Sequence, residues 1–349
     1  GPLANLRLAV VLFAVMNMVG RYQTAAVLAA PVTDSVAHRA GLKSGDQVLR
    51  VALDGDALEP VSSLEDLRAW MAEQTDQPLL LEVKAQARAA TRLLRLDAPS
   101  SVSEGVADGW QARGFTGAWS KPVVGEVVPG EPASEAGLQS GDVVVKVDGQ
   151  RVDDALTLRH LIRSSGVSAL PVTQLWEVER QGVLVTCDVT PIRVEEAGAH
   201  IGRVGAQLGQ MPERVWIQKD PMSALWLATT ETMATIKVTI HMIGRLLSGH
   251  AGLDQLAGPL RVADFAGRTA QMGLGVYLGY LAMLSVSIGV FNLLPVPVLD
   301  GGHLLYYLYE FVTGKSPSEY WLSLMQRLGL ALLLTLMMFT LLNDFTHLG

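Results

Sequence analysis

Hydrophobic positions follow different patterns along the chain, and each pattern predicts a different kind of structure. Apolar residues run almost without interruption over 3–19, 274–299 and 321–342, lengths that allow a helix to cross a bilayer. No charged residue occurs between Leu274 and Leu299. We therefore expect three membrane-spanning helices, with a long non-membrane segment between the first and the second.

Within that segment, one sequence pattern occurs twice. Residues 40–46 read AGLKSGD and residues 136–142 read AGLQSGD. In both copies an alternating strand, a DG turn, an amphipathic helix and closing strands follow. A repeat of this length is a domain rather than a solenoid unit. We therefore predict two similar domains, at residues 21–98 and 115–195, joined by a linker rich in Ser and Gly.

Residues 196–273 are expected to connect the second domain to the second span. Apolar residues recur at helical spacing over 221–247, but Glu231, Lys237 and Arg245 interrupt the pattern. Polar residues at that frequency are typical of an amphipathic helix at the membrane interface. A spanning helix stays open as the alternative, and it would move the C-terminus to the other side of the membrane.

The composition fits a protein that lies partly in a membrane. Of 349 residues, 49% are hydrophobic and 17% are charged, and the mean hydropathy is +0.29. A net charge of −7 gives no basic surface of the kind that binds nucleic acid, so we expect no nucleic-acid partner. The single cysteine, Cys187, excludes an internal disulfide framework and a multi-cysteine metal site.

A carboxylate, Asp300, stands at the end of the second long apolar run. A charged group at the centre of a membrane helix costs roughly 2.5–3.5 kcal/mol on insertion scales. Pro295 and Pro297 would break the helix just before it and free backbone carbonyls that lipid cannot satisfy. From these residues alone two interpretations stay open: a functional carboxylate inside the membrane, or a helix cap in water beyond the end of the span.

The chain offers Asp300 few partners for a metal site. None of the seven histidines begins an HExxH pattern, in which one helix face supplies two zinc ligands and a glutamate base. His303 follows Asp300 by three positions and could share its helix face, which alone is a weak half-site. No motif for an activated nucleophile or a phosphate loop occurs.

Several motifs together resemble one protein family. Residues 292–301, NLLPVPVLDG, are similar to the NxxPxPxxDG motif of the site-2 intramembrane metalloproteases, and residues 1–5, GPLAN, are similar to the GPxxN motif of their second membrane helix. The two AGL-x-x-GD repeats resemble bacterial PDZ domains, which bind peptides by strand addition. Residues 256–259, LAGP, resemble an LSGP element ahead of the third span. Two PDZ domains between spans point to the regulator-of-sigma-E protease branch, over essentially the whole chain.

The resemblance implies a multi-domain fold class. We expect an α-helical membrane protein with two α/β PDZ domains inserted between membrane spans. Residues 1–20 would form the membrane helix with the GPxxN motif, and residues 274–349 would form two further spans that carry NxxPxPxxDG. Peptide segments would bind at the PDZ domains, and the lipid bilayer would surround the spans.

The resemblance also implies roles for individual residues. Asp300 would be the third ligand of a Zn²⁺ ion, and Asn292, Pro295 and Pro297 would bind the substrate, whereas His303 has no role in the family motif. The other two ligands and the glutamate base would come from an HExxH helix that this chain does not contain, so no catalytic residue is assigned in it. We therefore expect the chain to be inactive by itself, most simply as a fragment that begins at the second span.

The implied function is that of a zinc endopeptidase in the bacterial inner membrane. It would cleave transmembrane segments of single-span substrates, such as an anti-sigma factor after a first cut, and remnant signal peptides. PDZ domains in the periplasm would filter access to the site. The alternative is a pseudoprotease, a non-catalytic membrane-anchored scaffold that binds peptides through its tandem PDZ domains.

Overall fold

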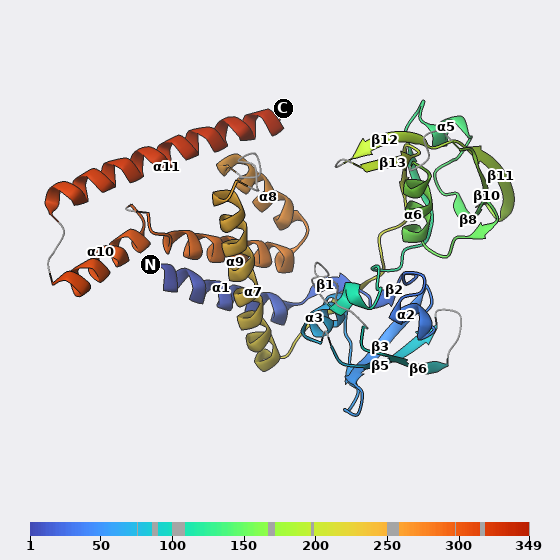
Figure 1. The fold of residues 1–349 in the computed structure, drawn as a ribbon, viewed down its shortest axis with the longest axis horizontal. Helices are drawn as coiled ribbons and strands as arrows, with labels where there is room; N and C mark the ends of the chain where they lie inside the picture. Colours follow the sequence, from blue (N-terminus) through green and yellow to red (C-terminus); the bar gives the residue numbers. More distant parts are fainter. Residues whose placement is uncertain are drawn as a thin grey trace. The chain divides into compact units, whose positions relative to one another are not determined.

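The computed structural model describes residues 1–74, 76–85, 90–99, 109–166, 172–196, 199–249, 258–296, 298–314 and 318–348. The chain divides into two compact units. One combines Gly1–Arg21 with Trp216–Gly349, and the other is Tyr22–Val215. The first consists mainly of helices and the second of small sheets with short helices (Figure 1). We call them the helical unit and the sheet unit.

The described helices of the helical unit follow the apolar runs of the sequence. Within the described residues, the helices Pro2–Val19 and Leu274–Asn292 are long and apolar enough to cross a membrane, judged by length and composition. The apolar run at 3–19 is thus confirmed as a helix, and the run predicted at 274–299 is helical from Leu274 to Asn292. The helices are α1 (Pro2–Val19), α7 (Pro221–Leu247), α8 (Pro259–Gln271), α9 (Leu274–Asn292), α10 (Asp300–Thr313) and α11 (Glu319–Leu348).

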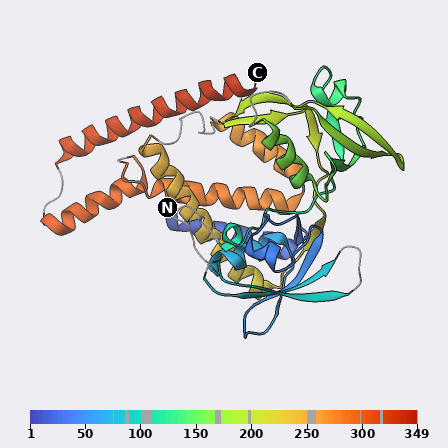
Figure 2. The ribbon, with the colours of Figure 1, turned by 45° about the vertical axis from the view of Figure 1, so that its right-hand side comes forward.

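Helix α7 has the bounds expected from the sequence, 221–247. It begins after Asp220, whose carboxylate accepts hydrogen bonds from Met222 N at 3.1 Å and Ser223 N at 3.2 Å, the arrangement that satisfies free N–H groups at a helix start. Figures 1 and 2 show α7 crossing α1 and α9 rather than running beside them. It does not meet the test of length and apolarity that α1 and α9 pass, so the interfacial position stays the prediction that fits it better.

Small and aliphatic side chains from three helices form the core of the helical unit. Phe13 and Met16 of α1 are buried against Ala228 of α7 and against Ala282 and Val286 of α9. Residues as small as alanine and glycine let helix backbones approach closely, which is how helices associate where lipid removes the hydrophobic driving force. The core therefore holds α1, α7 and α9 together.

The first domain of the sheet unit has an antiparallel sheet in the order β2-β3-β5-β6, with β4 also paired to β3. Leu67 and Met71 on the second helix are fully buried against this sheet. Trp110 and Phe115 belong to the same core, so the domain uses residues beyond the expected end at 98. The elements are β2 (Val27–Leu28), α2 (Val36–Arg39), β3 (Asp46–Leu53), β4 (Glu59–Pro60), α3 (Leu64–Glu73), β5 (Leu79–Ala85), β6 (Thr91–Leu96) and α4 (Gly109–Ala112).

The second domain repeats this plan with a sheet in the order β11-β10-β8-β9 and two further strand pairs, β14-β7 and β12-β13. Its core contains Leu158 and Trp176, and it extends to Val204, past the expected end at 195. The elements are β7 (Val124–Val127), α5 (Pro132–Glu135), β8 (Val143–Val147), β9 (Gln150–Arg151), α6 (Ala155–Ser165), β10 (Gln174–Arg180), β11 (Val183–Val189), β12 (Ile192–Glu196), β13 (Ala199–Arg203) and β14 (Ala206–Leu208). Strands β1 (Arg21–Thr24) and β15 (Arg214–Ile217) form one more pair.

The aspartate that ends each AGL-x-x-GD repeat has the same structural role in both domains. Asp46 and Asp142 are buried, with 2% and 1% of their surface exposed. Each accepts a hydrogen bond from the main-chain N–H three residues before it, at 2.8 and 2.9 Å. Each also pairs with an arginine, Arg92 in the first domain and Arg180 in the second. The signature thus marks a satisfied buried carboxylate that closes the turn before the strand.

Candidate metal centre

The helix that leads to Asp300 is broken, as the prolines predict. Helix α9 ends at Asn292, and Leu294 N bonds to Phe291 O at 3.0 Å in a tighter turn. Pro295 has no N–H to continue the helical ladder, so the chain leaves the helix here. Helix α10 then starts at Asp300. Pro297 lies outside the described residues.

The glycine after Asp300 allows α10 to begin close to the preceding loop. A Cβ atom on Gly301 would lie 2.3 Å from Leu294 O and 2.5 Å from Leu293 O, which is closer than any real contact. Gly301 is buried, whereas Asp300 at the same turn is exposed. The DG pair therefore combines a backbone that must pack tightly with a carboxylate that stays accessible.

The two family motifs meet at this carboxylate, although they lie at opposite ends of the sequence. A Cβ atom on Gly1 would lie 3.5 Å from Asp300 Oδ2. Among the described residues, the Asp300 side chain has no hydrogen-bond or ion-pair partner. A carboxylate with free oxygens at the start of a helix is available to a ligand from outside the described part of the chain.

Close packing of α1 on α9 produces this meeting. Ser285 Oγ donates a hydrogen bond to Asn5 O at 2.8 Å. A Cβ atom on Gly289 would lie 3.1 Å from Leu6 Cδ2 and 3.3 Å from Pro2 O. The small residues of α9 recur three or four positions apart, the spacing of one helix face. The spacing of these small residues in the sequence therefore indicates a helix-packing face, a signal for the contact with α1 that the motifs do not contain.

The predicted substrate-binding residues border the helix break. Asn292 is half-buried, and its amide makes no side-chain hydrogen bond within the described ranges, while Pro295 is exposed. A free amide can donate to and accept from an extended peptide. His303 is also exposed, with its ring edge-on to Tyr306 at 5.9 Å between centroids. These roles stay predictions.

The described residues do not complete a zinc site. A catalytic zinc ion has three protein ligands and an open position for water. Among the described residues, no three His, Cys, Asp or Glu side chains come together in a way that could hold a metal. Asp300 therefore qualifies as one ligand of a site that needs further ligands.

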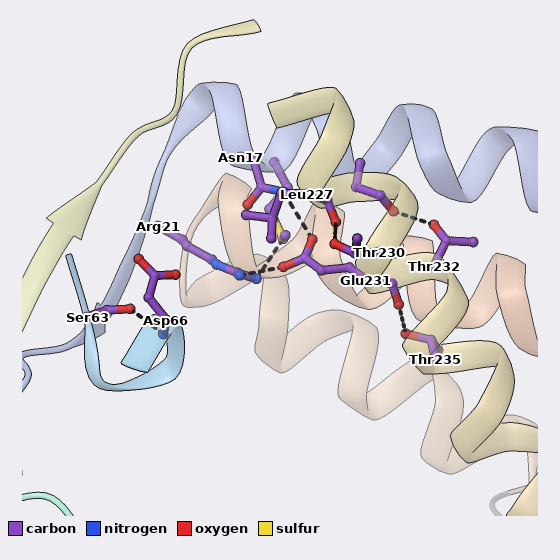
Figure 3. A network of polar contacts seen from close by, with 11 residues as sticks. Asn17, Arg21, Ser63, Asp66, Leu227, Thr230, Glu231, Thr232 and Thr235 are labelled. Carbon is purple, nitrogen blue, oxygen red and sulfur yellow. Dashed lines mark hydrogen bonds and ion pairs between the residues drawn. The ribbon is translucent and has the colours of Figure 1, made fainter. Parts of the chain in front are cut away.

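A polar network that the sequence did not predict joins α1 to α7 (Figure 3). Glu231 accepts a hydrogen bond from Asn17 Nδ2 at 3.0 Å through one oxygen, and pairs with Arg21 Nη2 at 2.6 Å through the other. Asn17 is 3% exposed. Glu231, which seemed only to interrupt an apolar pattern, thus fixes α7 to the C-terminal end of the first helix.

A second buried carboxylate explains the glycine of the LAGP element. Asp344 on α11 is fully buried, and a Cβ atom on Gly258 would lie 2.4 Å from its Oδ2. Gly258 and Pro259 begin α8, and the other two residues of LAGP lie outside the described ranges. The four donors to Asp344 are Gly258 N (3.0 Å), Leu260 N (3.0 Å), Arg261 N (3.1 Å) and Arg261 Nε (2.8 Å).

The sheet unit contains a cavity of about 1020 Å³ that residues from both of its domains line. Residues 30–33 and 41–44 border it on the side of the first domain, and residues 150–161 contribute several side chains on the side of the second. Two histidines, His38 and His160, belong to its lining. The cavity is large enough for a short peptide segment or a bulky side-chain cluster.

Comparison with known proteins decides the family. The profile described as "Peptidase family M50" matches residues 1–336. The chain belongs to peptidase family M50. This is the site-2 protease family that the motifs predict, so the sequence-based assignment is confirmed, and the chain is part of a family of metalloproteases.

Several curated M50 relatives are similar over much of their length. A protein of Ralstonia nicotianae that carries the name of a zinc metalloprotease is 36% identical over 358 residues, which cover 100% of this chain and 76% of that protein. A Neisseria meningitidis protein named in the same way is 34% identical over 363 residues, covering 100% and 78%. The regulator of sigma-E protease RseP of Escherichia coli is 39% identical over 232 residues, covering 65% of this chain and 51% of RseP.

Among solved structures, the PDZ domain of an SdrC-like protein from Listeria monocytogenes matches 27% of this M50 chain and 92% of its own chain, with 18% identity and a TM-score of 0.22. That score is too low to support a conclusion about fold. The family assignment therefore comes from the sequence matches.

Proposed function

We propose that this chain contributes the aspartate zinc ligand and the substrate-filtering domains of an intramembrane zinc endopeptidase. The observation that carries the proposal is the position of Asp300 Oδ2, 3.5 Å from where a Cβ of Gly1 would lie. It brings the NLLPVPVLDG and GPLAN motifs to one place. Packing alone gives no reason for an exposed carboxylate with free oxygens at this point. A role as metal ligand does give one, because a ligand needs oxygens that a metal ion can reach.

Zinc is the proposed cofactor because the two relatives matched over the whole chain carry the names of zinc metalloproteases. Bound zinc would lower the pKa of a water molecule toward about 7 and so supply the nucleophile for hydrolysis. Asp300 would bind the metal, and the amide of Asn292 would hold an extended substrate backbone. Among the described residues, no group of three or more His, Cys, Asp or Glu side chains could hold the metal, so we propose that further ligands of the complete site lie outside them.

The proposed substrates are transmembrane segments of single-span proteins, such as an anti-sigma factor after a first cut, and remnant signal peptides. The similarity to the regulator of sigma-E protease supports this class. The proposed location is the bacterial inner membrane, with several spans and with the sheet unit in the periplasm. A substrate must present an extended backbone in order to be cleaved. The segment between α9 and α10 is not helical, so an extended substrate could bind beside it.

We further propose that the two PDZ-like domains filter substrates through the cavity between them. Its volume of about 1020 Å³ would admit an extended peptide but not a folded domain. A peptide that adds as a strand to β14 of the second domain would compete with Arg159 for a main-chain acceptor, because Arg159 Nη2 on α6 already donates a hydrogen bond to Leu208 O at 2.9 Å. A peptide adding to that strand would have to displace Arg159.

The test compares cleavage of a single-span membrane substrate by the complete protein with Asp300 intact or changed to Asn. Asp300→Asn keeps the size of the side chain but removes the charge that binds a metal, so cleavage should be lost. His303→Ala, on the next turn of α10 and outside the family motif, is the matched control and should cleave normally. Equal cleavage by wild type and Asp300→Asn would exclude Asp300 from the mechanism.

The same experiment addresses the pseudoprotease alternative. A complete protein that binds peptides through its tandem domains and never cleaves a membrane substrate would be a scaffold. In that case Asp300→Asn would leave every measured property of the wild type unchanged. Metal-dependent cleavage by the wild type would exclude the scaffold.

A further inference from the structure

Asp154 stands at the junction of the two domains of the sheet unit and is fully buried. It is the N-cap of α6, where its Oδ1 accepts a hydrogen bond from Thr157 N at 2.7 Å. Its Oδ2 points into the first domain instead. There it accepts from Ala30 N at 2.7 Å and from Ser44 Oγ at 2.6 Å. One carboxylate therefore caps a helix in one domain and bonds two groups in the other.

The first domain uses a different residue at the matching position. Ser63 is the N-cap of α3, and its hydroxyl accepts from Asp66 N at 3.0 Å. A serine cap has one side-chain oxygen, whereas an aspartate cap has a second carboxylate oxygen that can accept hydrogen bonds from another element. The choice of Asp at residue 154 is therefore more than helix capping requires.

The repeat is also asymmetric on the side of the donor. Ser44 in AGLKSGD bonds to Asp154, while its counterpart Ser140 in AGLQSGD is exposed and makes no side-chain hydrogen bond within the described part of the chain. Two copies of one signature thus differ at the point where the domains meet. The turn of the first repeat therefore makes a hydrogen bond to the second domain through Ser44.

Two hydrogen bonds to the residues on either side of Asp154 support the same geometry. Trp119 Nε1 donates to Asp153 O at 3.1 Å, and Ala155 N donates to Ser120 O at 2.9 Å. A buried carboxylate is tolerated only when donors surround it, and all three donors to Asp154 are in place only in this arrangement of the domains. Undocking would remove two of the three, so the charge favours one relative orientation.

We propose that Asp154 is a positioning residue that locks the two PDZ-like domains into one body and thereby fixes the size of the cavity between them. Its partners Ala30, Ser44 and Thr157 all line that cavity, so loosening the junction would change the cavity wall directly. The consequence for substrate selection rests on the proposed function, whereas the lock itself does not.

The lock is tested by measuring the distance between the domains with paired spin labels on the complete protein in lipid nanodiscs. Labels attached at Asp56→Cys in the first domain and Thr186→Cys in the second use exposed positions. Cys187 is buried and is changed to Ala in all samples to leave only the two labels. The wild-type background should give one narrow distance distribution.

The decisive variant is Asp154→Ser, because serine keeps the cap of α6, as Ser63 does in α3, and removes the oxygen that crosses to the first domain. Loss of bonds to a charged group should shift the ratio of docked to undocked forms about tenfold or more, and the distribution should broaden. Ser44→Ala, which leaves the second domain untouched, should broaden it less. Ser140→Ala and Asp153→Asn are matched controls and should give the wild-type distribution.

An Asp154→Ser distribution as narrow as that of the wild type would overturn the proposal, and so would broadening by Ser140→Ala to the same extent as by Ser44→Ala. A cleavage assay on the same variants separates the lock from the filter. If Asp154→Ser broadens the distance distribution and the variant also cleaves substrates with a folded domain, the results support both the lock and the filter. If it broadens the distribution without changing which substrates are cleaved, the results support the lock and contradict the proposed filter.

Discussion

Ser285 on α9 donates a hydrogen bond to the main-chain carbonyl of Asn5 on α1, over a distance of 2.8 Å. This contact joins a helix that begins with GPLAN to the helix that ends at the NLLPVPVLDG break. Asp300 lies beyond the break at the start of α10, where Gly301 packs closely on Leu293 O and Leu294 O at the end of α9. The packing of α1 on α9 and of α10 on this loop together place Gly1 beside Asp300. The proposed metal centre therefore depends on how closely the two apolar helices α1 and α9 pack.

Enlarging Gly289 should disrupt this packing. A side chain there would meet Leu6 and Pro2 O at 3.1–3.3 Å, so we expect Gly289→Leu to push α1 away from α9 and cost roughly 1–3 kcal/mol of stability. Thermal unfolding in detergent and substrate cleavage would both decline. Gly267→Leu on α8, where an added Cβ meets nothing within 4 Å, is the control. Equal losses in the two variants would contradict the packing argument.

Removing Glu231 should loosen α7 from the first helix. Glu231→Ala leaves Asn17 and Arg21 without the carboxylate that they share, and an unsatisfied buried group costs roughly 1–3 kcal/mol. We expect faster hydrogen exchange along α7 and a lower unfolding temperature. Lys237→Ala, an exposed position on the same helix, should change neither. Similar exchange in both variants would show that the network does not hold α7.

Acid should destabilise the second domain through Asp142. Burial raises the pKa of this carboxyl, but hydrogen bonds from Arg180 and from Gln139 N outweigh burial, so its pKa lies below the usual range. A lowered folded-state pKa means that the stabilisation is present above the unfolded value of about 3.9 and is lost as the pH falls through the folded one.

Asp142→Asn should therefore lower stability at pH 7 by about 2 kcal/mol, because it removes the charge that pairs with Arg180, and should flatten the acid dependence. Unfolding of the domain can be followed by the fluorescence of the buried Trp176. Asp153→Asn is the control, because Asp153 is exposed and its side chain pairs with Arg151 at the surface. A wild-type acid dependence in Asp142→Asn would contradict the assignment.

Two aspartates of the helical unit should differ sharply in their effect on stability. Asp344→Ala removes the acceptor of four donors at the start of α8 and should cost roughly 2–4 kcal/mol. Asp264→Ala breaks an exposed pair with Arg268 at 2.8 Å and should cost less than about 1 kcal/mol. Chemical unfolding of the two variants would measure this. Equal effects would mean that Asp344 does not hold α8 to α11.

Local patterns in the sequence predicted α1, α7 and the start of α9, but not the helices α8 and α10. The bounds of α7 and the start of α9 at Leu274 agree with expectation, because apolar periodicity, an N-cap and an uncharged run are local signals. The break before Asp300 follows from the prolines for the same reason. The motifs identified the family, and the comparison confirmed it.

Apart from the α1–α9 contact, which the spacing of small residues on α9 indicates, long-range packing could not be predicted from local patterns. Trp110 and Phe115 stand near a segment rich in Ser and Gly, and nothing local indicates that they complete the first core. Glu231 and Asp154 look like ordinary polar residues until their partners, distant in sequence, are known. The two oxygens of one carboxylate can accept hydrogen bonds from two different elements, and a local sequence pattern does not reveal the element that is distant in the sequence.

The zinc content of the complete protein tests the central claim most directly. We expect the purified wild type to retain zinc, measured by elemental analysis, and Asp300→Ala to lose most of it, because a three-ligand site that loses one ligand binds the metal weakly. His303→Ala should retain the wild-type amount. Wild-type zinc content in Asp300→Ala would contradict the claim that Asp300, held beside Gly1, is a metal ligand.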